Sequence, residues 1–352
     1  MGEKLELALA VLNGAIGDYL VRTKNGLRTE LGLVHAGAPV PLERAALVAA
    51  FPEAKSRVVV FVPGLMCTES VWNYPDKTGS YPAHMERDLD VTSLTLRYNT
   101  GRSIADNGHD LDAWLTRLVA EYPVPLEEIV LLGFSMGGLV IRSACHVAKL
   151  AEDAREPLVS GASALSTPTE RKDGTHSHGW LSLVHRCFYV GTPHRGAPLE
   201  RAGRVLAKVL AVIDDPYTKL IADLANLRSA GVKDLGDADL RHEDTTRRTS
   251  GLRLSDPGHP VPLLVEIAHY LVAGTLWEKP LLAELFGDAL VPVTSGTFSR
   301  EGDRLLPPSH IRLFPGLSHM ALAHHPSVYE ALRTFFESHG HAPDGTLVGG
   351  ET

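Results

Sequence analysis

Ser135 is the residue whose type and setting most clearly suggest chemistry, because it lies inside the hexapeptide GFSMGG at residues 133–138. The apolar run IVLL at 129–132 precedes it, and a helical pattern at 139–150 follows. A G-x-S-x-G sequence between a strand and a helix is typical of a sharp turn that exposes the serine hydroxyl. The helix dipole and the unpaired N–H groups at that turn favour a developing oxyanion, so the sequence predicts a nucleophilic serine.

A serine nucleophile needs a histidine base, and His319 occupies the place where such a base is expected. In chain order the carboxylate and then the histidine follow the serine, with the histidine beyond the last strand. His319 comes just after the apolar run at 311–314. The alternatives are His310, which precedes that run, and His324 and His325, which the pattern assigns to the following helix; surface or supporting roles suit these three better.

The carboxylate that orients the histidine should follow an earlier strand, and Asp288 meets this condition. Gly287 precedes it and permits a tight turn. Glu284, predicted on a helix, and Asp303, predicted in a hairpin turn, remain alternatives.

Attack of the serine on a carbonyl carbon gives a tetrahedral intermediate with a negatively charged oxygen. Two N–H donors must stabilise that oxygen, one from the residue after the nucleophile and one from the loop after an early strand. Met136 supplies the first. The strand predicted at 57–62 runs into Pro63 and Gly64, so the N–H of Leu65 is the expected second donor, with Met66 less favoured.

The order of elements favours an α/β fold with a mostly parallel sheet and helices on both faces. A parallel sheet buried on both faces requires strands that are apolar throughout. Helical patterns occupy residues 106–121 and 139–150. Strands are predicted at 57–62, 91–97, 129–132, 187–190, 268–273 and 311–314.

The chain divides into a core and several additions. We expect a partly helical N-terminal extension at 1–50, a core at 51–197 and 261–340, an inserted helical cap or lid at 198–260, and a flexible tail at 341–352.

Composition limits the classes of partner and the cellular location that are expected. A formal net charge of −8 over 352 residues gives no basic footprint for nucleic acid, so no nucleic-acid partner is expected. The three cysteines, Cys67, Cys145 and Cys187, are sparse and form no CxxC pair, which argues against a disulfide framework. Acidic residues interrupt the first ten positions, and no run reaches about 18 apolar residues, so we expect no signal peptide, no membrane span and a cytoplasmic protein.

Cofactor motifs are missing from the sequence. It contains no HExxH, no P-loop and no GxGxxG, so neither a metal site nor an organic cofactor is expected. His176 and His178 could ligate a metal, but they stand in a polar segment where a surface role is more common.

Five ordered blocks resemble those of α/β-hydrolase-fold lipases and esterases, especially a bacterial lipase-like and GPI-inositol-deacylase-like branch. They are FVPGLM at 61–66, GFSMGG at 133–138, YVGTPHRGAP at 189–198, GDALVPV at 287–293 and GLSHMAL at 316–322.

This resemblance implies a triad of Ser135, Asp288 and His319, an oxyanion hole from Leu65 and Met136, and a helical cap after residue 198. One departure is Pro63, which stands where many lipases have histidine before the glycine. His194 is typical of the family, and a structural or supporting role is expected for it.

These features together predict a serine hydrolase that cleaves small-molecule or lipid esters through an acyl-enzyme, with transient contact at a lipid interface compatible with that role. Met66, Trp72 and Met320 are candidate walls of the substrate pocket. An acyltransferase or thioesterase would use the same triad, and a binding protein that keeps the fold without the chemistry is a less favoured alternative.

Overall fold

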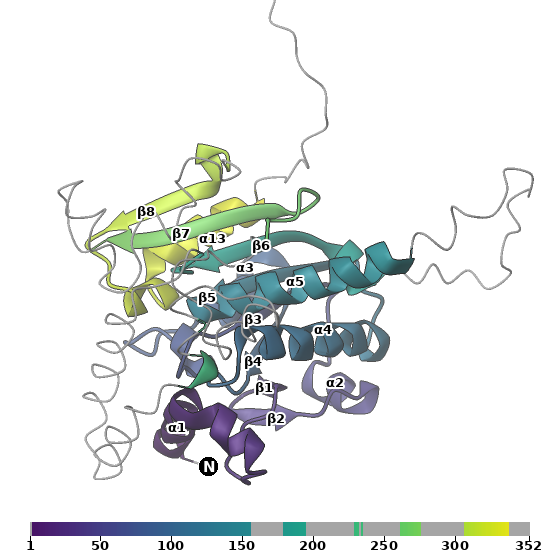
Figure 1. Ribbon diagram of the computed structural model, residues 1–352. Coiled ribbons are helices and arrows are strands. Elements are labelled where there is room, and N and C mark those ends of the chain that lie inside the picture. The colour runs from purple at the N-terminus through teal and green to yellow at the C-terminus, as the bar shows by residue number, and fades with distance from the viewer. Residues whose placement is uncertain are drawn as a thin grey trace, which may run out of the picture.

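A twisted eight-stranded sheet forms the centre of the described structure (Figure 1). The computed structural model describes residues 2–155, 179–194, 229–231, 234, 261–275 and 306–337. The strand order is β2-β1-β4-β3-β5-β6-β7-β8; β1 pairs antiparallel with β2 and β4, and the remaining neighbours are parallel. The strands are β1 (Gly32–His35), β2 (Ala38–Val40), β3 (Arg57–Val62), β4 (Thr92–Arg97), β5 (Glu128–Phe134), β6 (Val184–Val190), β7 (Ala268–Thr275) and β8 (Ile311–Pro315).

Helices cover both faces of this sheet. Figure 1 shows α4 and α5 in front of the strands, α3 and α13 behind them, and α1 beside β1. The α-helices are α1 (Glu3–Arg22), α2 (Arg44–Ala50), α3 (Tyr81–Leu89), α4 (Ile104–Glu121), α5 (Met136–Arg155) and α13 (Pro326–Glu337). Four short 3-10 helices accompany them in the described ranges: η1 (Glu69–Trp72), η2 (Trp180–Leu183), η3 (Pro308–His310) and η4 (Met320–Ala323).

The alternation of side chains along the central strands gives the protein two cores. In β3, Val58 and Val60 pack toward α4 and α5, whereas Val59 and Phe61 pack toward α3 and α13. All four side chains are fully buried. Successive residues of a strand point to opposite faces, so a strand between two helical layers must be apolar at every position.

The predicted fold class is confirmed in its sheet and its two helical layers. All six predicted strands and both predicted helices are present, with ends that differ by a few residues. The sequence did not predict the edge strands β1 and β2. The predicted cap at 198–260 lies outside the described residues except for 229–231 and 234. No helix in the described ranges is long and apolar enough to cross a membrane.

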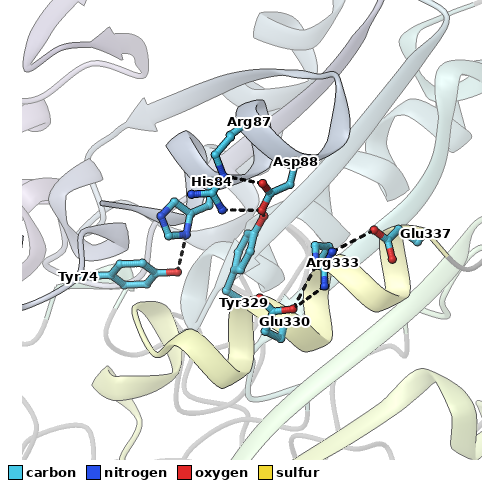
Figure 2. A network of polar contacts seen from close by, with 8 residues as sticks. All are labelled: Tyr74, His84, Arg87, Asp88, Tyr329, Glu330, Arg333 and Glu337. Carbon is cyan, nitrogen blue, oxygen red and sulfur yellow. Dashed lines mark hydrogen bonds and ion pairs between the residues drawn. The ribbon is translucent and has the colours of Figure 1, made fainter. Parts of the chain in front are cut away.

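A polar network joins α3 to α13 behind the sheet (Figure 2). The Tyr329 hydroxyl donates to Asp88 Oδ2 over 2.6 Å, and Arg87 donates two hydrogen bonds to the same carboxylate. Nearby, the Tyr74 hydroxyl lies 3.0 Å from His84 Nδ1. The network fixes the start of the chain's last described helix against α3.

Replacing Asp88 by asparagine is expected to destabilise the protein in a pH-dependent way. Arg87 and the Tyr329 hydroxyl hold the pKa of Asp88 well below its usual range. A folded-state pKa below the unfolded value of about 3.9 stabilises the fold fully above that pH, and the contribution disappears as the pH falls through the folded-state pKa.

Thermal unfolding of the Asp88→Asn variant should therefore show a lower Tm than the wild type near pH 7, and this gap should narrow at about pH 2. Asp90→Asn is the matched control, because it removes an exposed carboxylate paired with Lys55 at the end of the same helix. A gap for Asp88→Asn that stayed constant with pH would contradict the assigned ion pair.

Candidate active site

Ser135 forms the corner between β5 and α5. Its φ of 53° is left-handed, a conformation that a residue with a Cβ adopts only where the surroundings impose it. Crowding explains the glycines on either side: a Cβ on Gly133 would lie 2.5 Å from the backbone nitrogen of Gly138, and one on Gly137 would overlap the carbonyl oxygen of Val62. The predicted strand–turn–helix setting of the serine is thus confirmed.

Backbone hydrogen bonds continue across the ends of the parallel strands and hold this corner in place. The Ser135 N–H donates to the Val190 carbonyl over 2.8 Å, and the next residue of that loop, Gly191, donates to Val272 over 2.7 Å. Gly316 donates in the same manner to Thr275 over 2.6 Å. These three bonds form a rim at the carboxyl ends of β5, β6, β7 and β8.

His319 lies at this same rim. It follows β8, directly precedes the short helix η4, and is only 5% exposed. Its ring packs 5.0 Å, centroid to centroid, from the ring of Phe134, the residue directly before Ser135. Gly191, with a φ of +60°, lies against the same ring, where an added Cβ would be 3.0 Å from Cε1. The structure therefore brings His319 to Phe134 at the end of β5 and to Gly191 just after β6.

Tyr81 anchors the loop that follows His319. Its fully buried hydroxyl lies 2.9 Å from the Leu322 carbonyl and 2.8 Å from the His325 carbonyl, and it accepts the His325 N–H over 2.9 Å. Burial raises the pKa of Tyr81, so the hydroxyl keeps its proton and remains a donor. Tyr81 thus connects helix α3 to the segment that carries His319.

The three alternative histidines make other contacts. His310 Nδ1 lies 3.1 Å from the His269 carbonyl, and His324 Nδ1 lies 3.2 Å from the Val71 carbonyl. His325 Nδ1 accepts the Ser327 N–H at the start of α13. His324 and His325 precede α13, so their predicted place on a helix is wrong; Pro326 begins that helix.

The turn after β3 passes directly over Ser135. A Cβ on Gly64 would lie 2.9 Å from the Ser135 Cβ, which leaves no room for any residue but glycine there. The Tyr98 hydroxyl holds the preceding Pro63 carbonyl over 2.8 Å. The turn therefore brings the backbone that leads into Leu65 to the serine, as the oxyanion prediction requires.

The two candidate donors in this turn differ in their partners. The Met66 N–H donates to Thr100 Oγ1 over 3.0 Å, so that donor is already engaged. The Leu65 N–H makes no hydrogen bond to another described residue. Met136 opens helix α5, where the first N–H groups have no intrahelical acceptor. This arrangement favours Leu65 over Met66.

The candidate pocket residues occupy different environments. Trp72 is fully buried and packs edge-on against Phe61 and Phe134, and Met66 is buried beneath α1. Met320 is partly buried beside His319. As pocket walls all three stay predictions. The predicted acid Asp288 and its alternatives Glu284 and Asp303 lie outside the described residues.

His194 is buried behind the rim. Arg142 donates to its carbonyl, and the ring packs edge-on against Tyr189 at 4.8 Å. Burial first, and then the nearby Arg142, lower the pKa of His194 well below its usual value, so the ring is neutral. The described residues contain no group of three or more His, Cys, Asp or Glu arranged to hold a metal, and His176 and His178 lie outside them.

Two side chains at this site carried no sequence signal. Tyr81 acts across 241 positions and Thr100 across 34, so neither forms a local motif. Only the fold brings each of them to its partner.

No protein-family model and no curated protein matches the chain. Solved structures with a similar fold include the mature form of a Bacillus licheniformis lipase, at 16% identity and a TM-score of 0.46, covering 79% of this chain and 91% of that one. A lipase-esterase related protein from Clostridium acetobutylicum matches at 11% identity and a TM-score of 0.40, covering 87% and 99%. A Pyrococcus furiosus esterase matches at 12% and 0.42, covering 80% of each chain.

The sheet of this chain itself identifies its architecture. A parallel array in the order β4-β3-β5-β6-β7-β8, with a serine at the β5–α5 corner, is the arrangement of the α/β-hydrolase fold.

Proposed function

We propose that this protein is a serine hydrolase that cleaves carboxylic esters. The observation that carries the proposal is the corner itself. Ser135 stands there in a left-handed conformation, with the ring of His319 packed on the residue before it and the Gly64 turn passing over its Cβ. A nucleophile, a base and an oxyanion-binding backbone in one place are the minimum equipment for acyl transfer.

In this mechanism His319 takes the hydroxyl proton as Ser135 Oγ attacks the ester carbonyl. The negative oxygen of the tetrahedral intermediate accepts hydrogen bonds from the N–H groups of Leu65 and Met136. Collapse expels the alcohol, which takes the proton from His319, and leaves an acyl-enzyme. Water then attacks the acyl-enzyme in the same way, with His319 again as the base, and the carboxylic acid is released as Ser135 recovers its proton. Asp288 is proposed as the carboxylate that orients His319.

A fluorophosphonate probe tests the nucleophile directly, since it phosphonylates activated serines. We expect one equivalent of probe on the folded protein, located on Ser135 by peptide mass spectrometry, with loss of p-nitrophenyl ester hydrolysis in proportion to labelling. Heat-unfolded protein is the control and should remain unlabelled. Labelling at another serine, or hydrolysis that survives complete labelling of Ser135, would contradict the proposal.

The substrate class is proposed as esters with apolar acyl chains, because Leu65 in the oxyanion turn and Met320 next to His319 are apolar and only partly buried. A series of p-nitrophenyl esters of increasing chain length separates an esterase from a lipase. A sharp rise in rate above the solubility limit of the substrate indicates a lipase, and a preference for short soluble esters indicates an esterase.

A further inference from the structure

Helix α1 packs against the two turns that follow β3 and β4, although its sequence resembles no block of the hydrolase core. A side chain at Gly14 would overlap Met66 Cγ and would lie 3.1 Å from Thr100 Oγ1. A side chain at Gly17 would overlap Asn99, whose Nδ2 donates to the Gly17 carbonyl over 3.1 Å. The helix backbone is thus in direct contact with the turn that carries Leu65.

Further contacts hold the helix in this position. Arg97, at the end of β4, pairs with Glu6 of α1 and with Glu69 of η1. All three side chains are largely buried, with 16–18% of their surface exposed, so this network is shielded from solvent better than most surface pairs. Ser229 donates to the Gly14 carbonyl over 2.7 Å.

Thr100 is the link between this helix and the oxyanion turn. Its hydroxyl accepts the Met66 N–H, and both residues are almost fully buried. Met66 itself has a φ of 61°, a strained conformation for a residue with a side chain, which persists only where the surroundings enforce it. The hydrogen bond that the Met66 N–H donates to Thr100 fixes the peptide unit between Leu65 and Met66. The orientation of that unit constrains the preceding peptide, which carries the Leu65 N–H.

We propose that Thr100, supported by Gly14 of helix α1, is a positioning residue that aims the Leu65 N–H at the oxyanion. The inference rests on the proposed serine-hydrolase function. It links the N-terminal helix to the active site, because α1 packs against the turn that carries Leu65. Thr100 accepts the Met66 N–H, which would otherwise compete with the Leu65 N–H for the oxyanion.

Thr100→Val tests the link, because valine keeps the shape and loses the acceptor. We expect kcat for a p-nitrophenyl ester to fall about 10- to 100-fold, since small displacements of a catalytic group cost up to about 10²-fold. KM should stay within about twofold, because the oxyanion contact strengthens in the transition state. Thr100→Ser restores the acceptor and should recover kcat to within about threefold.

A trifluoromethyl ketone, which forms a tetrahedral adduct with the serine, supplies a readout that a structural role would not move. Its affinity should fall in Thr100→Val in step with kcat, whereas the affinity for the product acid should not change. Wild-type kcat in Thr100→Val, or equal losses in the valine and serine variants, would overturn the proposal.

Gly14→Ala tests the helix and serves if Thr100→Val does not fold. Alanine there should press on Met66 and lower kcat about tenfold, although alanine is a better helix former than glycine. Gly26→Ala, where nothing lies within 4 Å, is the control and should keep full activity. Full activity in Gly14→Ala would remove α1 from the mechanism. If the wild type neither labels with fluorophosphonate nor hydrolyses esters, the proposed function has failed; if it does both, only the positioning role is at stake.

Discussion

Alanine in place of Ser135 is expected to lower kcat for ester hydrolysis by about 10⁶-fold. The hydroxyl is the only group at the corner that can form the acyl-enzyme in the proposed mechanism. The rate that remains should be the small acceleration from the oxyanion-binding N–H groups acting on water. Steady-state hydrolysis of a p-nitrophenyl ester, with protein from a host lacking background esterases, measures the change.

Stability must be separated from chemistry in this comparison. Ser135→Ala keeps a side chain in a left-handed conformation and should unfold at nearly the wild-type temperature. Ser93→Ala is the matched control: this buried serine donates to the Pro82 carbonyl over 2.9 Å, so its loss should cost about 1 kcal/mol of stability and leave kcat unchanged. Wild-type turnover in Ser135→Ala would assign the nucleophile elsewhere.

Alanine in place of His319 is expected to lower kcat by a similar factor, about 10⁶-fold, because the serine hydroxyl is a poor nucleophile without a base. The double variant Ser135→Ala/His319→Ala should lose no more than either single variant, since the two groups act as one unit. Purified variants are compared by the same ester assay, extended to long incubations.

His325→Ala is the control for this pair. It lies in the same loop and removes only the acceptor for the Ser327 N–H at the start of α13, so it should lower Tm slightly and leave kcat unchanged. If the losses of the two single variants multiplied in the double variant, Ser135 and His319 would act independently, and the proposed proton transfer between them would be wrong.

The sequence was sufficient to predict the strands in the middle of the sheet. Strand β3 was predicted to the residue, because an apolar run between turn residues has few other solutions in an α/β protein. The edge strands were not predicted, because β1 and β2 are short and β2 contains Pro39. Their hairpin depends on a two-residue turn, Ala36 and Gly37, in which both residues are left-handed; only Gly37 signals this.

For the site, sequence order was enough to predict that His319 lies near Ser135, because the strand before it sets its position at the rim. It could not select Thr100, whose hydroxyl acts on a backbone group 34 positions away. The sequence also assigned no role to helix α1. The need for glycine at positions 14 and 17 becomes clear only from their contacts with Met66 and Asn99. Local patterns identify groups that react, whereas groups that hold them in place depend on tertiary contact.

The rim of hydrogen bonds at Ser135, Gly191 and Gly316 has a consequence for redesign. Each bond extends the strand pairing by one more step, so the reactive corner is part of the sheet and inherits its rigidity. In a protein built on such a sheet, loops that carry no reacting group tolerate exchange. Substrate preference can therefore be altered by exchanging those loops, in the way that binding loops are exchanged on an antibody framework, while the reacting groups keep their geometry.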